Sequence, residues 1–339
     1  MFFKGMSFGF MARNGYYSSD GGQAEMRRVI ASGATAVALM VNFMQDTFAS
    51  TRVYRDFILT PSDDEVRDAI RTFRQAGIKV MLKPILNIWD STHRGDVAFP
   101  EPLEMIAGIK MDYWGEWFKN YTAAIVHYAR LCELEGAEML CVGCEMTGEE
   151  KQEKYWFPLI EDVRKVYHGL VTYNTPCWWH YDVRQNWIRG WFSELDMIGI
   201  SNYYGNAHGD LGMQIDVFDE KHIAQGFMKQ RRFLDEAYDI LKKPIFFAEC
   251  GVRSVRGAVE APSDCWENQN DFDGQIQCDY MGGFMRAYWD APWWAGFFWW
   301  KWDEQQNRPY FHHATGDTGC TIAGKPAEKF FHDLKVPVR

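Results

Sequence analysis

Short apolar runs alternate with amphipathic segments eight times along this 339-residue chain, and no other feature limits the possible folds so strongly. Nearly continuous apolar runs of strand length are typical of parallel strands buried on both faces, and the amphipathic segments between them are suited to cover such a sheet. The expected strands are 3–10, 35–42, 79–84, 138–145, 169–173, 195–201, 244–249 and 295–302. Eight such units favour a closed (β/α)8 barrel, the TIM barrel, over an open sheet.

Local end signals agree with this division. Ser62-Asp-Asp-Glu65 has the capping-box pattern that begins a helix, and Gly136 is suited to end a helix over 113–135. Thr147-Gly-Glu-Glu150 is expected to cap the helix that follows the fourth strand, and Pro326 to Leu334 forms the last helix. The first-turn acidic residues Glu149 and Glu150 are then explained by the helix dipole.

Long connections follow strands, whereas the connections that follow helices are short. The long ones are 45–61, 87–112, 202–220, 251–273 and 303–325. Long loops gathered on one rim of a barrel are typical of an active-site face. There is no linker, repeat or low-complexity tract, so residues 1–339 are expected to form a single barrel domain.

Composition limits the class of substrate. A net charge of −10 argues against binding to nucleic acid or to an anionic membrane surface, both of which call for basic patches. The aromatic share of 16%, with fifteen Trp, exceeds what a core usually demands. Most of these rings are expected in the core, and the surplus suits a carbohydrate cleft, where flat rings stack on sugars. No run approaches the ~20 apolar residues that span a bilayer.

Most of the eight cysteines fall inside expected core elements, which favours free thiols over disulfides. The opening Met1-Phe-Phe-Lys-Gly-Met-Ser-Phe lacks a basic stretch followed by a long apolar one, as a secretory signal would have. A reduced, cytoplasmic protein is therefore expected. The oligomeric state is left open.

Two glutamates stand at the ends of apolar strands. Glu145 closes the run that begins at Glu138, and Glu249 closes the run that begins at Pro244. A carboxylate among apolar side chains is costly unless it is paired or needed for chemistry. In an eight-stranded ring the fourth and seventh strands end on opposite sides of the mouth. Two carboxylates so placed are able to cleave a glycosidic bond, and retaining glycosidases hold them roughly 5 Å apart. The alternative is that each glutamate is a buried ion-pair partner.

Four motifs, in this order, carry a resemblance to a known family. They are Val142-Gly-Cys-Glu145, Asp196-Met-Ile-Gly-Ile-Ser-Asn-Tyr-Tyr204, Phe246-Phe-Ala-Glu-Cys-Gly251 and Gly296-Phe-Phe-Trp-Trp-Lys-Trp302. The set resembles glycoside hydrolase family 113, whose best known members are β-1,4-mannanases, within the clan of retaining (β/α)8-barrel glycosidases. The resemblance implies that Glu145 is the general acid/base and Glu249 the nucleophile, with no metal or organic cofactor. The acid needs a raised pKa, and the nucleophile needs to stay ionised.

The resemblance also implies the residues around this pair. Tyr203 is expected to donate a hydrogen bond to the nucleophile. It lies two residues after Ser201 and therefore on the same face of the strand, and Tyr204 takes its place if the register slips. Trp300 and Trp302 are expected on one face of the last strand, one of them forming the floor of the sugar site, with core packing as the alternative. Further expected sugar contacts come from three polar residues, Lys83, Arg94 and Asn202.

The chain departs from the clan at two positions. Cys144 stands before the acid/base, where many members carry the Asn that binds the sugar 2-hydroxyl, and Asn87 follows Lys83-Pro-Ile-Leu where many relatives have His after Lys-Pro. Mannose and glucose differ at the 2-hydroxyl. The expected substrate is a β-1,4-linked mannoside, mannan or manno-oligosaccharide, with glucosides or glucosamine oligomers as the alternative. Endo and exo action both stay open.

Two other functions are compatible with the sequence. Lys83 permits a Schiff-base lyase, because barrel aldolases use a lysine at a strand end. A non-catalytic carbohydrate-binding barrel is the third reading. Cys141-x-x-Cys144 has zinc spacing, but the two side chains are expected on opposite faces of a strand and no second pair follows, so no metal is expected.

Overall fold

The expected barrel is present. The computed structural model describes residues 1–100, 111–176, 188–203, 219–263, 271–302 and 317–338. Eight parallel strands run in the order β1-β9-β8-β7-β6-β5-β4-β2, and pairing of β1 with β2 closes the ring. The strands are β1 (Phe3–Phe8), β2 (Ala36–Gln45), β4 (Lys79–Ile88), β5 (Met139–Cys144), β6 (Leu170–Thr175), β7 (Met197–Ser201), β8 (Ile245–Cys250) and β9 (Trp294–Trp302). The short β3 (Val53–Tyr54) pairs antiparallel with the end of β2.

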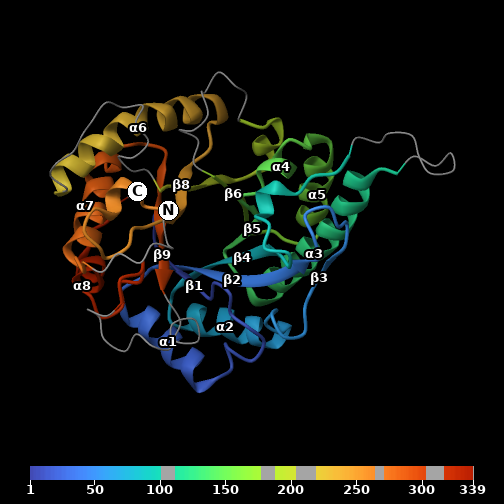
Figure 1. Cartoon of the computed structure of the whole chain (residues 1–339), viewed down its shortest axis with the longest axis horizontal. Helices are drawn as coiled ribbons and strands as arrows, with labels where there is room; N and C mark the ends of the chain where they lie inside the picture. The colour runs from blue at the N-terminus through green and yellow to red at the C-terminus, as the bar shows by residue number, and fades with distance from the viewer. Residues whose placement is uncertain (101–110, 177–187, 204–218, 264–270, 303–316, 339) are drawn as a thin grey trace.

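Helices surround the strands (Figure 1). They are α1 (Asp20–Ala31), α2 (Asp63–Gln75), α3 (Tyr113–Glu135), α4 (Thr147–Glu150), α5 (Glu153–Arg164), α6 (Glu220–Leu241), α7 (Gln275–Tyr288) and α8 (Pro326–Asp333). Short 3-10 turns in the described segments include η1 (Arg94–Asp96), η5 (Gly190–Glu194) and η7 (Ala258–Glu260). None of the helices among the described residues is long and apolar enough to cross a bilayer.

End signals in the sequence largely correspond to the observed helix ends. Ser62 and Glu65 form the reciprocal capping box of α2, and Gly136 ends α3 in the left-handed conformation at φ +69°. The expectation for Thr147 is wrong: Met146 occupies the N-cap position of α4, and the Thr147 hydroxyl instead donates to the Gly95 carbonyl at 3.0 Å.

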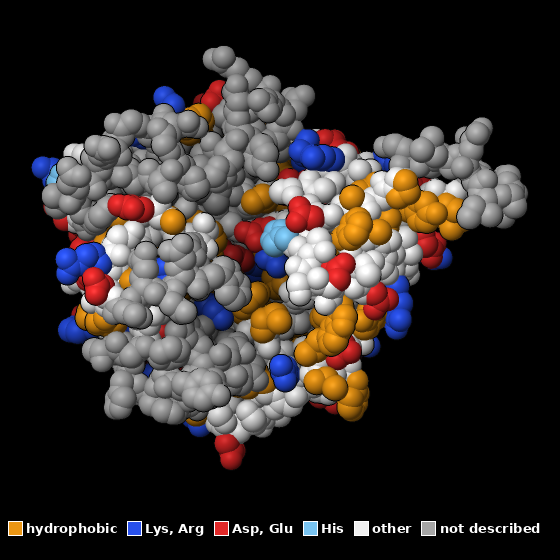
Figure 2. Space-filling model, viewed as in Figure 1, with side chains coloured by type: hydrophobic (Ala, Val, Ile, Leu, Met, Phe, Trp, Pro, Cys, Tyr) orange, Lys and Arg blue, Asp and Glu red, His pale blue; other side chains and the backbone are white. Residues whose placement is uncertain are grey.

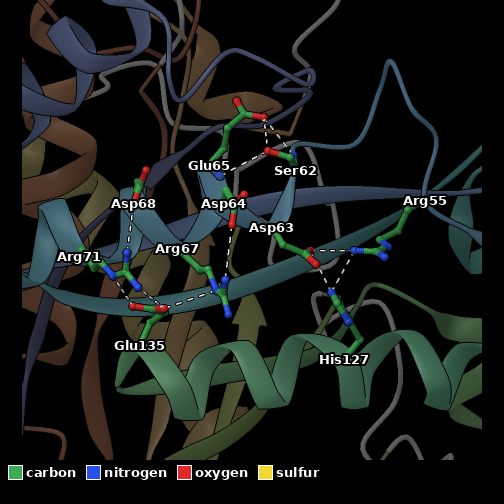
Figure 3. Close-up of polar contacts among 10 residues, drawn as sticks. All are labelled: Arg55, Ser62, Asp63, Asp64, Glu65, Arg67, Asp68, Arg71, His127 and Glu135. Carbon is green, nitrogen blue, oxygen red and sulfur yellow. Dashed lines mark hydrogen bonds and ion pairs between the residues drawn. The ribbon is translucent and has the colours of Figure 1, made fainter.

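Charged side chains join α2 to α3 (Figure 3). Glu135 accepts two bonds from Arg71, at 2.6 and 2.8 Å, while Asp63 accepts from Arg55 at 2.7 Å and lies 2.9 Å from His127. The fork of two parallel bonds to Glu135 is the strong form of this contact. These contacts lie on the outer layer and fix the helices that flank β2 and β4.

Alternation along the strands separates two apolar layers. Side chains of one face fill the barrel interior, and those of the other face pack against the helices. Near the mouth a separate interior cluster contains Met40, Ile85, Cys144, Tyr203, Trp300 and Cys320. Seven tryptophans of the described residues are fully buried, so much of the aromatic surplus serves packing. The six cysteines among the described residues are free and buried.

Candidate active site

Glu249 lies at the C-terminal end of β8 with its side chain 4% exposed, and three side chains among the described residues contact its carboxylate. The Lys83 ammonium donates to Oε1 at 2.5 Å, and the Tyr203 hydroxyl donates to Oε2 at 2.9 Å. The Cys144 thiol, whose pKa is raised by burial, donates to Oε1 at 3.5 Å. A buried carboxylate is stable as an anion when it is paired and hydrogen-bonded in this way.

Lys83 is held by a polar network inside the barrel. Its side chain is fully buried, and its ammonium also donates to Asn174 Oδ1 at 3.1 Å. Asn174 in turn donates to the Ser201 hydroxyl at 2.8 Å. Burial alone lowers the pKa of Lys83, but the negative charge of Glu249 and its hydrogen bond raise it above its ordinary value. The lysine is therefore a cation that pairs with Glu249.

Glu145 immediately follows β5 in a left-handed backbone conformation, at φ +53°. Its amide donates to the Asn174 carbonyl at 2.7 Å, beside an irregularity in the pairing of β5 with β6. A left-handed non-glycine residue is uncommon and frequent at functional sites. Arg94 of η1 donates to Glu145 Oε2 at 2.9 Å, and Nε2 of His93 lies 3.8 Å from the same oxygen.

The charge state of Glu145 differs from the expected one. Burial alone raises the pKa of its carboxyl, but the His93 imidazole and the Arg94 charge lower it. The Ser201 hydroxyl and Lys83 add to this lowering, and the net pKa lies well below its ordinary value. We expected a raised pKa for an acid, whereas the structure holds Glu145 in its ionised form.

Cys144 and Arg94 connect the two glutamates through a chain of contacts. Arg94 donates to the Cys144 carbonyl at 2.9 Å while it binds Glu145, and the Cys144 thiol contacts Glu249. Figure 2 shows acidic, basic and histidine side chains gathered in a hollow between β8 and β5 at the centre of this face. Strands far apart in the sequence thus bring both carboxylates to one mouth of the barrel, as predicted.

Trp300 belongs to the interior cluster at this mouth, beside the Lys83–Glu249 pair. The Lys83 ammonium lies 5.8 Å from the centre of the Trp300 ring, and Phe10 packs against that ring edge-on at 4.9 Å. This position is compatible with the expected floor of a sugar site.

The expectation that Trp302 shares a face with Trp300 is wrong. Trp302 is fully buried in the layer between the strands and the helices, where its indole N–H donates to Glu25 of α1 at 2.7 Å. The register between β1 and β9 shifts between Met6 and Phe8, so strict alternation fails at the end of β9. Core packing, the alternative that the sequence allowed, is what the structure shows for Trp302.

Asn202 also faces away from the mouth. Its side chain is 1% exposed and accepts from Gln230 of α6 at 2.9 Å, while its carbonyl accepts from Tyr280 of α7. A sugar contact from this side chain does not fit that position. Tyr203 and Ser201 occupy the inward face as predicted, and Tyr204 lies outside the described residues.

Two further expectations fail because of burial and an irregular strand. Glu149 and Glu150 are 0% and 5% exposed; burial raises the pKa of Glu149 well above its ordinary value and that of Glu150 to about 7, which removes the helix-dipole explanation. Cys141 and Cys144 both belong to clusters inside the barrel, because β5 is irregular between them. Among the described residues no group of three or more His, Cys, Asp or Glu is placed to hold a metal ion.

Sequence reasoning missed His93 and Asn174. Asn174 lies two residues after Thr172 on the inward face of β6, and extending the expected strand by one residue would have reached it. His93 lies on a loop, where no periodicity indicates direction.

Comparison with known proteins places this barrel. The model of glycoside hydrolase family 113 matches residues 6–325. The chain belongs to this family.

Three solved structures agree with the family match, each over nearly the full length of both chains. A "Structure of GH113 beta-1,4-mannanase" shares 30% identity over 98% of this chain and 97% of that chain, with a TM-score of 0.78. The GH113 β-mannanase AaManA from Alicyclobacillus acidocaldarius, in complex with ManMIm, shares 28% identity over 98% and 96%, with a TM-score of 0.81. A complex of a GH113 β-1,4-mannanase shares 29% identity over 98% and 97%, with a TM-score of 0.79.

More distant structures share the fold alone: a structure of fungal β-1,4-galactanases matches with 14% identity and a TM-score of 0.60. Comparison with curated protein sequences gave no match. Family membership makes this chain a glycoside hydrolase, as the resemblance implied.

Proposed function

We propose that this glycoside hydrolase cleaves β-1,4-linked mannosides with retention of configuration, through a glycosyl-enzyme intermediate on Glu249. The observation that carries the mechanism is the pair of bonds from Lys83 and Tyr203 to the Glu249 carboxylate, inside a barrel mouth that also holds Glu145. The sugar is proposed from the titles of the similar structures, which describe β-mannanases.

In the first step a Glu249 oxygen attacks the anomeric carbon while Glu145 gives a proton to the leaving glycosidic oxygen. In the second step Glu145 takes a proton from water, the water oxygen attacks the same carbon, and the bond to Glu249 breaks. Lys83 and Tyr203 keep Glu249 anionic and oriented for attack. Glu145 is ionised in the free protein, the form that the second step uses, so it takes up a proton from solvent before the first step.

The surroundings of Lys83 disfavour a Schiff-base lyase. A lysine nucleophile has to lose its proton near neutral pH, and its pKa is lowered for that purpose. Here the pKa of Lys83 is raised, and its ammonium is engaged by Glu249 and Asn174.

Product analysis on matched oligosaccharides tests the substrate. We expect mannohexaose to be cut, with kcat/KM at least about fivefold above that on cellohexaose or chitohexaose, since a stereochemical mismatch that leaves site groups unpaired costs about 1 kcal/mol or more. Cleavage of only the glucose or glucosamine oligomers would keep the mechanism and overturn the sugar. Binding of mannohexaose without turnover would support a carbohydrate-binding barrel instead.

Replacing Tyr203 with Phe is expected to lower kcat by roughly 10- to 100-fold, because a hydrogen bond to a charged group contributes about 1.5–3 kcal/mol. The matched control is Tyr280→Phe, which removes a buried hydroxyl that binds the Asn202 carbonyl outside the barrel. We expect the control to keep its rate on p-nitrophenyl β-mannoside. Equal rates for the two variants would refute the role of Tyr203.

A further inference from the structure

Arg94 binds both the backbone carbonyl of Cys144 and the side-chain carboxylate of Glu145, and so forms a bridge between them. Its Nε donates to the Cys144 carbonyl at 2.9 Å, and its Nη2 donates to Glu145 Oε2 at 2.9 Å. The arginine side chain is only 12% exposed and the glutamate side chain 18%. Two bonds from one planar guanidinium fix the direction of the carboxylate as well as its charge. Arg94 was expected to contact sugar, yet its donors Nε and Nη2 are directed to the protein.

The segment that carries Arg94 is built to approach Glu145 closely. A Cβ atom at Gly95 would lie 2.8 Å from the Glu145 carbonyl and 2.6 Å from the Thr147 hydroxyl. The Thr147 hydroxyl also donates to the Gly95 carbonyl. Any larger residue at Gly95 would push η1 away from the start of α4, so this glycine permits the contact on which the bridge depends.

Several charged or polar groups face the Glu145 carboxylate. Arg94 of η1 and His93, the residue before η1, lie on one side of it. Lys83 of β4 and Ser201 of β7 also face it. His93 Nδ1 accepts from the Gly95 amide at 3.1 Å, which leaves the imidazole proton on Nε2, toward Glu145. Lys83 is already paired with Glu249, and Ser201 carries no charge. Within the part of the chain that the structure describes, Arg94 is therefore the full positive charge in direct contact with Glu145.

We infer that Arg94 is a positioning residue that holds Glu145 in one orientation and favours its ionised form, so that Arg94 decides the pH range in which Glu145 can act as an acid. This inference rests on the proposed function, in which Glu145 is the acid/base. Removal of the guanidinium leaves the carboxylate less stabilised, and Glu145 then keeps its proton to higher pH.

Titration of Glu145 in the intact protein tests the inference. Glutamate carboxyl groups labelled with ¹³C are followed by NMR, and the Glu145 signal is assigned by its loss in Glu145→Gln. We expect Arg94→Met to move the titration of Glu145 upward by about 1 to 3 pH units, the effect of an opposite charge at this distance. Arg94→Lys keeps the charge but not the two hydrogen bonds of the guanidinium. Its Glu145 titration is expected to lie close to that of the wild type, with most of the upward movement seen in Arg94→Met absent.

The matched control is Arg164→Met at the opposite end of the barrel. Arg164 likewise joins a carboxylate, Asp196 at 2.6 Å, to a backbone carbonyl, that of Gly169 at 3.1 Å. We expect no movement of the Glu145 titration in this variant. Titration of Glu145 at the same pH in wild type and Arg94→Met, or an equal shift in Arg164→Met, would overturn the inference.

Activity separates this inference from the proposed function. On mannohexaose, the pH–activity profile of Arg94→Met, scaled to its own maximum, should extend to higher pH than that of the wild type. On a 2,4-dinitrophenyl β-mannoside the leaving group needs no proton, so the rate of the first step should not follow the Glu145 titration. If Glu145→Gln retains wild-type activity on mannohexaose, the proposed function fails. If Glu145 is required and its titration does not respond to Arg94, only the role of Arg94 fails.

Discussion

Replacing Glu249 with Gln is expected to lower turnover of manno-oligosaccharides by at least about 10⁴-fold, the scale on which loss of an enzymatic nucleophile acts. The amide keeps the shape of the side chain but removes the negative charge that attacks the anomeric carbon. The same change leaves the Lys83 ammonium, which is fully buried, without its anionic partner. Breaking a buried pair from one side costs about 3–5 kcal/mol. Lower stability should therefore accompany the loss of rate. Rates are to be compared at a temperature at which circular dichroism shows that both proteins are folded.

The control for this variant is Glu25→Gln. Glu25 is also buried and likewise accepts from one basic and one aromatic side chain, Arg28 and Trp302, but it lies on α1 outside the barrel. We expect it to lose stability and keep its turnover. Substantial hydrolysis by folded Glu249→Gln would remove Glu249 from the mechanism.

Replacing Glu145 with Gln is expected to have an effect that depends on the leaving group. Hydrolysis of mannohexaose, whose leaving alcohol needs a proton, should fall by roughly 10² to 10⁴ fold, the usual contribution of general acid–base catalysis. A 2,4-dinitrophenyl β-mannoside should still react in the first step, because dinitrophenolate leaves without a proton. The second step then lacks its base, so a burst of dinitrophenolate should precede a slow steady state.

The smaller variant Glu145→Ala offers an independent check of the same role. Azide, which attacks without needing a base, should restore the second step and yield a β-mannosyl azide. An α-configured azide would indicate a single displacement and contradict retention. Equal losses on both leaving groups would contradict the role of Glu145 as an acid.

Much of the fold was predictable because burial leaves a periodic trace. The helix expected over 113–135 is observed at Tyr113–Glu135, and the strand expected over 295–302 begins one residue earlier, at Trp294. Where a strand is irregular, period-two reasoning fails. Trp302 at the end of β9 faces away from Trp300, and Cys141 and Cys144 of β5 share the barrel interior instead of pointing to opposite faces, each case beside a shift in strand register. Such shifts depend on pairing with a distant strand, which local sequence does not encode.

The candidate site was predictable where a residue stands at the end of an apolar strand. Glu145 and Glu249 follow or end strands at the same mouth as expected, and Tyr203 donates to Glu249 there. Side-chain partners were less accessible to sequence reasoning. Lys83 was expected to touch sugar but pairs with Glu249, and Arg94 pairs with Glu145. The charge state of Glu145 follows from these contacts between loops and strands rather than from its own position.

Trapping the intermediate tests the central claim most directly. The protein is incubated with 2,4-dinitrophenyl 2-deoxy-2-fluoro-β-mannoside, in which fluorine slows both steps and the dinitrophenolate leaving group keeps the first step fast, so that the intermediate accumulates. Peptides are then mapped by mass spectrometry. We predict one added fluoromannosyl group on the peptide 244–251, attached to Glu249, with no labelling in Glu249→Gln. A label on another residue, or turnover with no covalent species and an inverted product, would contradict the double displacement proposed here.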